Sequence, residues 1–483
     1  MPRRAPSFTI GKSTNGLPYI EGIPNINENK YMKKLKELSK TNVKVELIPH
    51  AEFKQKLQLI FASGEIPDLL QTDGINSTEV APAIDAGVLL PLNDLIDKYA
   101  PNMKKALPKE AWQYGTVSKD GVIYGIPTLE PAPYGGASFI RKDWLDKLGL
   151  PVPKTLDEFV TVMKAFRDKD PNGNGKQDEL PWSAREKFRF GDAFFGAYGV
   201  NPEGWKLVNG ELVPNFILPE MKAALDFHRM LYAEKLFDNE SFVQQGKDWD
   251  AKIRGKGIVG FWSHSAQEAQ LWSAEVKKNS PDANVVPIPS PVGPDGKGGY
   301  LIRSVVNPKT WVISKSAKNP EEIIKFMDFF FTEEGQRLVT YGIEGDNYTM
   351  ENGKIKYKYP SASDATAVQE EIARQEWFRF TGPTYLSDPE FMKNKPENEK
   401  VVQALEISKK EGRVNDGDGI PALPTLKTRP ELKFDGLWLE FAAKVITGKE
   451  SSDGFDKFVA DWKKRGGDQL IKEATQWYNQ SKK

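Results

Sequence analysis

Strand-like and helix-like segments alternate through the first third of this chain, and that alternation restricts the folds open to it. Val43, Val45 and Leu47 are apolar at every second position, as in a half-buried strand. Residues 31–40 and 53–64 instead place apolar side chains at helical spacing, one segment on each side of that strand. A β-α-β-α-β order of this kind predicts an α/β fold, in which a parallel sheet is covered by helices.

The length of the chain indicates more than one unit. At 483 residues it is too long for one ordinary domain, so we expect two or three units that each bury a core. A short strand predicted at 138–141 leads directly into a new helix, and we place the first crossover between lobes there. The strand predicted around Trp311, Val312 and Ile313 is interpreted as the return to the first lobe.

The strongest chemical signal lies at residues 170–179, which read DPNGNGKQDE. Ca²⁺ is bound by six to eight oxygens at about 2.3–2.6 Å, and alternate residues of a tightly turning loop can present them. A helix expected at 155–169 leads into this loop and begins with a capping box of Thr155 and Glu158. We predict a calcium site that uses five side chains and, at Lys176, a backbone carbonyl: Asp170, Asn172, Asn174, Lys176, Asp178 and Glu179.

The end of this loop departs from an EF-hand. An EF-hand has a bidentate Glu at position 12, but that position is Pro181 here, so Glu179 at position 10 must close the site. No second helix is recognisable after Pro181 and Trp182. The loop is therefore predicted to be a rigid structural clamp and not a sensor that opens. The alternative is a solvated Asn/Gly turn that binds no metal.

Charge and composition argue against several classes of function. Lys plus Arg and Asp plus Glu number 67 each, so the chain lacks the basic surplus of a general nucleic-acid binder. No apolar run approaches the roughly 20 residues that span a bilayer, and no leader peptide is visible at the start, which is interpreted as trimmed. The chain has no cysteine, which excludes disulfides and thiolate metal sites. No P-loop, nucleophile elbow or HExxH motif supports an enzyme.

Several short motifs of this chain resemble, in their order and spacing, the motifs of family 1 of the extracellular solute-binding proteins of carbohydrate ABC transporters. They are FASGEIPD at 61–68, GVLLPL at 87–92, YGIP at 124–127, IRKDWLDKLGL at 140–150 and YGIEG at 341–345. The loop at 170–179 is similar to that of the larger, lipoprotein-like branch, which includes alginate-oligosaccharide-binding proteins. Its predicted ligands match the liganding positions of that branch one for one.

This resemblance implies a two-lobed, type II periplasmic-binding-protein-like fold with a ligand cleft between the lobes. The first lobe would comprise residues 1–138 and 305–360, and the second, which carries the calcium loop, residues 139–304 and 361–483. The protein would be a monomer that captures an oligosaccharide and delivers it to the permease subunits of an ABC importer. It would lie outside the cytoplasm, either in a periplasm or lipid-anchored on the outer face of a Gram-positive cell membrane.

Candidate ligand residues follow from what sugar recognition requires. The apolar faces of pyranose rings stack on flat aromatic side chains, and the hydroxyls need directed polar groups. Such residues are expected near crossovers and at strand ends, which selects Asp73, Tyr134, Trp262, Arg303, Trp377, Arg379 and Trp438. Each has a plainer alternative, because a Trp can be a core residue and Asp73 or Arg303 can form a cap or a surface ion pair.

Two other functions compete with transport. With 67 acidic residues, the chain could hold the carboxylate pair of a glycosidase or lyase, although no local motif indicates one. The same architecture could also bind a peptide or a siderophore, because a fold does not fix its ligand. A net charge of zero favours neither acidic nor neutral glycans.

Overall fold

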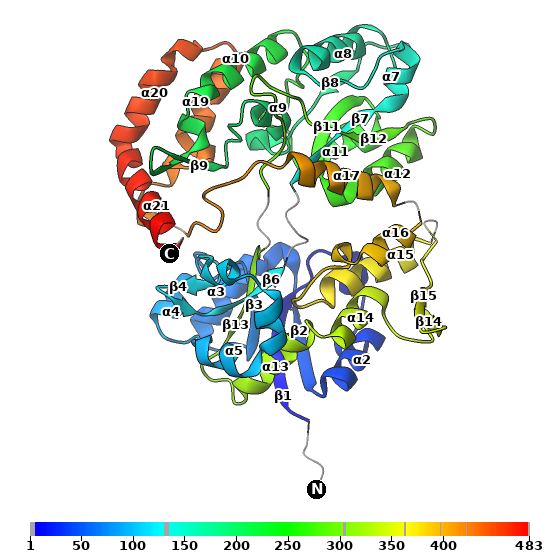
Figure 1. Cartoon of the computed structure of the whole chain (residues 1–483), viewed down its shortest axis with the longest axis vertical. Helices are drawn as coiled ribbons and strands as arrows, with labels where there is room; N and C mark the ends of the chain where they lie inside the picture. The colour runs from blue at the N-terminus through cyan, green and yellow to red at the C-terminus, as the bar shows by residue number, and fades with distance from the viewer. Residues whose placement is uncertain are drawn as a thin grey trace. The chain divides into compact units, whose positions relative to one another are not determined.

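The protein is divided into two compact units, seen here in a computed structural model (Figure 1). The structure describes residues 5–129, 135–302, 306–361, 364–396, 398–421 and 423–481. The first unit comprises Met1–Ala132 and Ser304–Pro396, and the second comprises Pro133–Arg303 and Glu397–Lys483. Among the helices that the structure describes, none is both long and apolar enough to cross a membrane.

The first unit is built on a sheet with the strand order β2-β1-β3-β13-β6. Strand β1 pairs in parallel with both β2 and β3, as the β-α-β-α-β pattern predicts, whereas β13 runs antiparallel to β3 and to β6. The strands are β1 (Ser7–Ser13), β2 (Asn42–Ile48), β3 (Leu69–Thr72), β6 (Gly125–Leu129) and β13 (Val306–Ile313). The main helices are α2 (Lys30–Ser39), α3 (Phe53–Ser63), α13 (Pro320–Phe329), α14 (Glu333–Tyr341) and α15 (Ala365–Ile372).

The core of the first unit joins segments that are far apart in the sequence. Phe8 and Ile10 point from β1 into the same buried cluster as Trp311, Trp377 and Phe380. The rings of Trp311 and Phe380 stack with centroids 5.0 Å apart, and the Trp311 indole N–H donates to the Phe380 carbonyl at 2.7 Å. The segment 364–396 is therefore part of the first unit.

This packing corrects one predicted domain boundary. The sequence motifs place the last return to the second lobe at 360/361, but the chain changes unit at 396/397. The earlier changes fall at 132/133 and 303/304, where the sequence predicts 138/139 and 304/305. The last boundary differs because α15 and the turns after it carry the buried Trp377, Phe378 and Phe380, which complete the first core.

The second unit contains a sheet with the order β12-β7-β11-β8. Strand β7 runs antiparallel to β11 and β12, whereas β8 pairs with β11 in parallel. The strands are β7 (Gly136–Arg141), β8 (Leu180–Trp182), β11 (Val259–Ser265) and β12 (Val285–Ile288). The helices include α7 (Lys142–Leu148), α8 (Leu156–Asp168), α9 (Asp192–Ala197), α10 (Glu220–Ala233), α12 (Ala269–Asn279), α17 (Glu399–Glu411), α19 (Leu439–Ile446), α20 (Phe455–Trp462) and α21 (Asp468–Ser481).

Helix α8 forms as its local sequence predicts. The Thr155 hydroxyl accepts from the Glu158 backbone N–H at 3.3 Å, and the Glu158 carboxylate accepts from the Thr155 N–H at 3.2 Å, which completes the capping box. The predicted apolar stripe of this helix is buried, namely Phe159, Val162, Met163 and Phe166. The helix ends at the start of the 170–179 loop, so its packing fixes one side of that loop.

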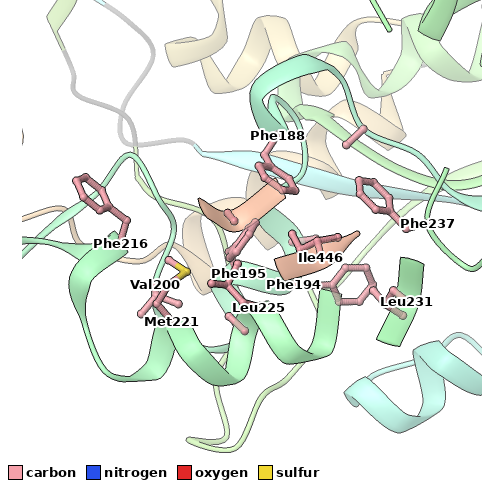
Figure 2. Packing of buried hydrophobic residues seen from close by; sticks show 14 of the residues in the cluster. Phe188, Phe194, Phe195, Val200, Phe216, Met221, Leu225, Leu231, Phe237 and Ile446 are labelled. Carbon is pink, nitrogen blue, oxygen red and sulfur yellow. The ribbon is translucent and has the colours of Figure 1, made fainter. Parts of the chain in front are cut away.

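The second core is rich in phenylalanine. Figure 2 shows part of this cluster, including Phe188, Phe194 and Phe195. The ring of His228 lies within it, stacked on Phe195 with centroids 4.0 Å apart, and is completely buried. Such a large aromatic core holds the loops on which a pocket of this unit is built.

Candidate functional site

The carboxyl ends of β1, β3 and β6 meet at one edge of the first sheet. Strand β1 is parallel to β3, and β13 is antiparallel to both β3 and β6, so these three strands run the same way. Asp73 follows β3 at this edge and is half-buried. Lys309, at an irregularity in the β13–β6 register, donates to the Asn15 side-chain oxygen at 2.7 Å. Polar side chains thus gather where α/β sheets commonly bind ligands.

Trp377 and Arg379 lie at the same edge, as the sequence predicts for ligand residues, but their side chains are mostly enclosed. The Trp377 indole N–H donates to the Ser13 carbonyl at 2.7 Å, at the end of β1, and the ring is fully buried. Arg379 donates to the carbonyls of Leu129 and Gly382 at 3.0 and 2.9 Å and is 9% exposed. In this structure Trp377 offers no ring face to a sugar, whereas Asp73 and the partly accessible Arg379 remain candidates.

Sequence reasoning missed Lys12, which also reaches this edge. Lys12 follows Phe8 and Ile10 at two-residue spacing, so it lies on the core-facing side of β1. Its side chain is 1% exposed, and its ammonium lies over the rings of Phe380, Trp311 and Trp377. The signal was present in the sequence, because a charge at a core-facing position of a strand is unusual.

The second unit contains a pocket of about 130 Å³ beside its sheet. The floor is formed by Tyr300, whose hydroxyl lies 2.7 Å from the hydroxyls of Ser138 and Ser263. These two serines are opposite each other in the β7–β11 pair, so Tyr300 ties both strands together. The lining residues are Gly136, Lys187, Phe188, Phe190, Asp192, Phe195, Asn201, Pro202, Glu203, Ser263, His264, Tyr300, Leu301 and Phe434.

One wall of this pocket is a backbone-strained loop. Lys187, Phe188 and Phe190 have φ angles of 58°, 59° and 61°, a left-handed conformation that costs residues with a Cβ about 1 kcal/mol each. The loop places the half-buried ring of Phe190 against His264, with centroids 4.1 Å apart, and near Trp249 at 5.6 Å. His264 in turn lies 3.0 Å from the Glu268 carboxylate. This aromatic packing offsets the cost of the strained backbone, and it holds Phe190 at the pocket wall.

A polar group with unmet hydrogen bonds faces the same pocket. Asn201 is 1% exposed, and within the described part of the chain neither its side-chain oxygen nor its nitrogen has a hydrogen-bond partner. Leaving a buried amide unpaired is costly, which favours a ligand or a bound water at this position. The lining of this pocket therefore combines the half-buried aromatic ring of Phe190 with the buried side-chain amide of Asn201.

Two predicted tryptophans of the second unit do not line this pocket. Trp262 is fully buried between Phe139 and Trp272, because it points to the opposite side of β11 from Ser263. Trp438 is fully buried behind the pocket, with ring centroids 6.0 Å from Phe188 and 5.9 Å from Phe195. Neither ring has an exposed face for the predicted stacking. The predicted ligand residues Tyr134 and Arg303 lie outside the described residues.

Sequence reasoning did not single out Phe190, Asn201 or Tyr300. The position of Phe190 depends on the left-handed backbone of Lys187, Phe188 and Phe190, which glycine would have signalled but lysine and phenylalanine do not. His264 also contributes to the pocket lining, and its ring packs against Phe190. The pattern of apolar residues alone therefore could not separate the pocket wall from the core.

The loop at 170–179 is tightly folded on its own oxygen-bearing side chains. The Asp170 carboxylate accepts from the backbone N–H groups of Asn174 and Gly175 at 3.1 and 3.0 Å. The Asn172 side-chain oxygen accepts from Asn174 N–H at 2.9 Å, and the Asn174 oxygen accepts from Lys176 N–H at 2.8 Å. Gly175 takes a φ of 75°, which provides the sharp bend expected of position 6.

The carboxylates at the end of the loop fit a cation. Asp178 accepts from the side-chain amides of Asn172 and Asn174 at 3.0–3.2 Å. Glu179 is 7% exposed, and its carboxylate has only the backbone N–H groups of Glu179 and Asn172 as poorly placed donors, with no hydrogen bond of good geometry to a described residue. Burial raises the pKa of Glu179, the backbone N–H groups of Glu179 and Asn172 oppose this effect, and the charges of Asp170 and Asp178 add to it. A bound cation would stabilise a buried carboxylate that lies near two other negative charges.

The oxygen donors of this loop nevertheless do not include three acidic side chains that converge on one position. Among the described residues, no group of three or more His, Cys, Asp or Glu side chains is placed to hold a metal ion. The loop instead mixes carboxylates with amide oxygens, as oxygen-binding Ca²⁺ sites do. Strand β8 follows the loop directly, so no second helix pairs with α8 across it.

An α/β chain in two units, with polar side chains at one sheet edge and an aromatic-lined pocket in the other unit, has the features of a two-lobed ligand-binding protein. The chain matches the family of bacterial extracellular solute-binding proteins over residues 25–337, and it belongs to this family. Its members act outside the cytoplasm as solute-binding proteins.

Individual relatives extend this assignment. The polygalacturonan/rhamnogalacturonan-binding protein YtcQ of Bacillus subtilis is 27% identical over 470 residues, which cover 94% of this chain and 89% of YtcQ. The fructooligosaccharide ABC transporter substrate-binding protein FusA of Streptococcus pneumoniae is 36% identical over 220 residues, 42% of this chain and 40% of FusA. The crystal structure of alginate-binding protein AlgQ2 without calcium ion aligns with a TM-score of 0.71 at 23% identity, over 99% of this chain and 98% of AlgQ2. These likenesses confirm the predicted two-lobed α/β fold class.

Proposed function

We propose that this protein is the solute-binding subunit of an ABC importer and that its solute is an oligosaccharide. The observation that carries this proposal is the pocket of the second unit, where Phe190 and the unpaired amide of Asn201 lie together. A sugar ring presents an apolar face and a rim of hydroxyls, which complement these two groups. The names of YtcQ and FusA support the proposal, since both proteins are described by the saccharides that they bind.

Side chains at the strand edge of the first unit are proposed to contribute further polar contacts. Asp73 can accept hydrogen bonds from sugar hydroxyls, and Arg379 can donate them. Both occupy loops or turns at strand ends, which a rigid sheet positions. An enzymatic role is not proposed, because the family is one of solute-binding proteins and the chain lacks a local catalytic motif.

A calorimetric titration tests the proposed function directly. The purified chain is titrated with pectin-, alginate- and fructan-derived oligosaccharides, and we expect binding to at least one class at one site per chain. The same mixtures are then assayed for new reducing ends, which we expect to be absent. If no oligosaccharide binds, or if reducing ends accumulate, the proposed function is wrong.

We also propose that the 170–179 loop holds a structural Ca²⁺ ion. Asp170, Asn172, Asn174, Asp178 and Glu179 would supply side-chain oxygens, and Lys176 its carbonyl oxygen. The proposal is supported by the buried Glu179 carboxylate, which has no hydrogen bond of good geometry to a described residue, and by the nearby charges of Asp170 and Asp178. When bound, the ion would supply charge compensation and bracing between α8 and β8, with no part in the transport cycle itself.

The same proposal has consequences for the partners, the oligomeric state and the location of the protein. An importer subunit hands its solute to permease subunits, which would be its protein partners, and it would act as a monomer. We propose a location in the periplasm or on the outer face of a Gram-positive membrane through a lipid anchor. Labelling of intact cells with a membrane-impermeant reagent would reveal whether the protein faces the exterior.

A further inference from the structure

Lys12 is a buried cation at the polar edge of the first sheet. It belongs to β1, where Phe8 and Ile10 point into the core on the same side, and its side chain is 1% exposed. Methionine has a similar length and shape, and would fill the same space without carrying a charge into the interior. The presence of lysine at this position therefore calls for an explanation.

Aromatic rings surround the Lys12 ammonium. The nitrogen lies 4.2 Å from the ring centroid of Phe380, 4.6 Å from that of Trp311 and 5.1 Å from that of Trp377. Both indoles are fixed, because their N–H groups donate to the carbonyls of Phe380 and Ser13 at 2.7 Å. Cation–π attraction thus holds the ammonium in place but brings no opposite charge to it.

No acid pairs with Lys12 in the described part of the chain, where its side chain forms no ion pair or hydrogen bond. The charges near it are those of Lys309 and Arg379, which have the same sign. Burial lowers the pKa of Lys12 well below its usual value, and these two cations lower it further. Burial also lowers the pKa of Lys309, and the nearby carboxylate of Asp73 opposes this effect.

The accessible side of this cluster is formed by Lys309 and Asp73, which are both half-buried. Lys309 is held by Asn15 through a hydrogen bond of 2.7 Å, so its charge is not neutralised by that contact. Arg379 donates to main-chain carbonyls, which orient its guanidinium. The edge therefore places the charges of Lys309 and Arg379 near a buried ammonium that has no ion pair with any residue the structure describes.

We propose that this edge of the first unit, with Lys12 at its base and Lys309 at its mouth, receives an anionic substituent of the bound saccharide. The substituent is a carboxylate or a sulfate, each of which supplies the missing negative charge together with several acceptor oxygens. This inference rests on the proposed function and adds that the preferred oligosaccharide is acidic. Asp73 would then discriminate against a second negative charge at the mouth and accept a hydroxyl instead.

The test compares matched acidic and neutral ligands by calorimetry. The ligands are an oligogalacturonate, its fully methyl-esterified form and a sulfated oligosaccharide that carries no carboxylate, and the proteins are wild type, Lys12→Met and Lys44→Met. Lys44→Met is the matched control, because it makes the same substitution at an exposed position of the neighbouring strand β2. Titrations are repeated at low and high ionic strength, because screening weakens a charged contact selectively.

We expect wild type to bind at least one acidic ligand about tenfold or more tightly than the ester, because a hydrogen bond to a charged group is worth more than one to a neutral group. Lys12→Met should abolish this preference and also raise the melting temperature, since it removes a buried unpaired charge. A purely structural lysine would instead lower the melting temperature on replacement and leave the ratio of affinities unchanged. Lys44→Met should keep both the preference and the melting temperature.

The outcomes separate this inference from the proposed function. Equal binding of ester and acids by wild type, or an unchanged preference in Lys12→Met, overturns the inference and leaves saccharide binding intact. Absence of binding by all three ligands, and by neutral fructans in the same instrument, overturns both. A preference for the carboxylated ligand over the sulfated one, or the reverse, identifies which anion the edge accepts.

Discussion

The imidazole of His228 lies face to face with the ring of Phe195, with centroids 4.0 Å apart and planes inclined by 21°. Its Nδ1 donates to the Ala224 carbonyl at 2.7 Å, whereas Nε2 has no partner among the described residues. Burial lowers the pKa of His228 to about 4. The ring is therefore neutral in the folded protein at neutral pH and cannot be charged without disturbing the core.

This pKa shift predicts acid sensitivity. The folded-state pKa of about 4 lies below the unfolded value of 6.5, so the unfolded chain binds more protons between these values. The contribution of His228 to the free energy of unfolding is fully present above pH 6.5. It is lost as the pH falls toward 4, and the loss amounts to about 3 kcal/mol at most. Urea unfolding at pH 7 and pH 5 measures the loss. His228→Gln should reduce the difference between the two pH values, whereas His50→Gln, at an exposed site, should leave it unchanged.

The 170–179 loop predicts opposite effects of one substitution with and without calcium. In the presence of chelator, Glu179→Gln should raise the melting temperature, because it removes a buried unpaired carboxylate near Asp170 and Asp178. With excess Ca²⁺, wild type should gain about 2–4 kcal/mol of stability through binding to the native state, and the variant should gain much less. Differential scanning calorimetry measures both. A wild-type melting curve that calcium does not change would contradict the proposed site.

The pocket of the second unit predicts which side chains carry affinity. Phe190→Ala should weaken oligosaccharide binding roughly tenfold or more by removing the stacking surface. Asn201→Ala should weaken it by roughly three- to tenfold through the loss of hydrogen bonds. Phe458→Ala is the control, because Phe458 is also half-buried in this unit but stacks on Phe441, with centroids 4.7 Å apart. Isothermal titration should find its affinity unchanged, even though its melting temperature falls.

Trp438 provides a test of the distinction between core and pocket wall. Because its ring is buried among Phe188, Phe195 and Phe216, Trp438→Ala should lower the free energy of unfolding by about 3–5 kcal/mol. Denaturant unfolding measures this loss, and the milder Trp438→Phe provides a folded protein for titration. If Trp438→Phe loses affinity without losing stability, the tryptophan contacts the ligand after all.

Local patterns predicted the parts of the fold that local energetics decide. The capping box of Thr155 and Glu158 and the alternation of Val43 and Val45 predicted a helix and a strand that the structure contains. The tight turn at 170–179 was also predicted, because its oxygen-bearing residues lie close together in the sequence, whereas calcium binding by this loop stays a prediction. These features depend on neighbours within a few residues, so they require no knowledge of the tertiary structure.

The remaining features depend on distant partners. The last change of unit was misplaced because residues 364–396 pack on Trp311, which is far away in the sequence. The residues next to Trp262 and Trp438 in the sequence suggested a ligand site. In the folded protein, distant segments of the chain cover both rings. Lys12 was overlooked, although its spacing from Phe8 and Ile10 shows which side of the strand it occupies.

The hydrogen bond from the Trp377 indole to the Ser13 carbonyl joins residues 364 positions apart. During synthesis, this hydrogen bond at the end of the first strand therefore cannot form until most of the polypeptide has been made. The second unit is also interrupted, but the segment that completes it begins only after the first unit is finished. The amino-terminal unit consequently cannot close its core until the segment that ends at Pro396 has been made, and it can then close while the last segment of the second unit, Glu397–Lys483, is still being synthesised.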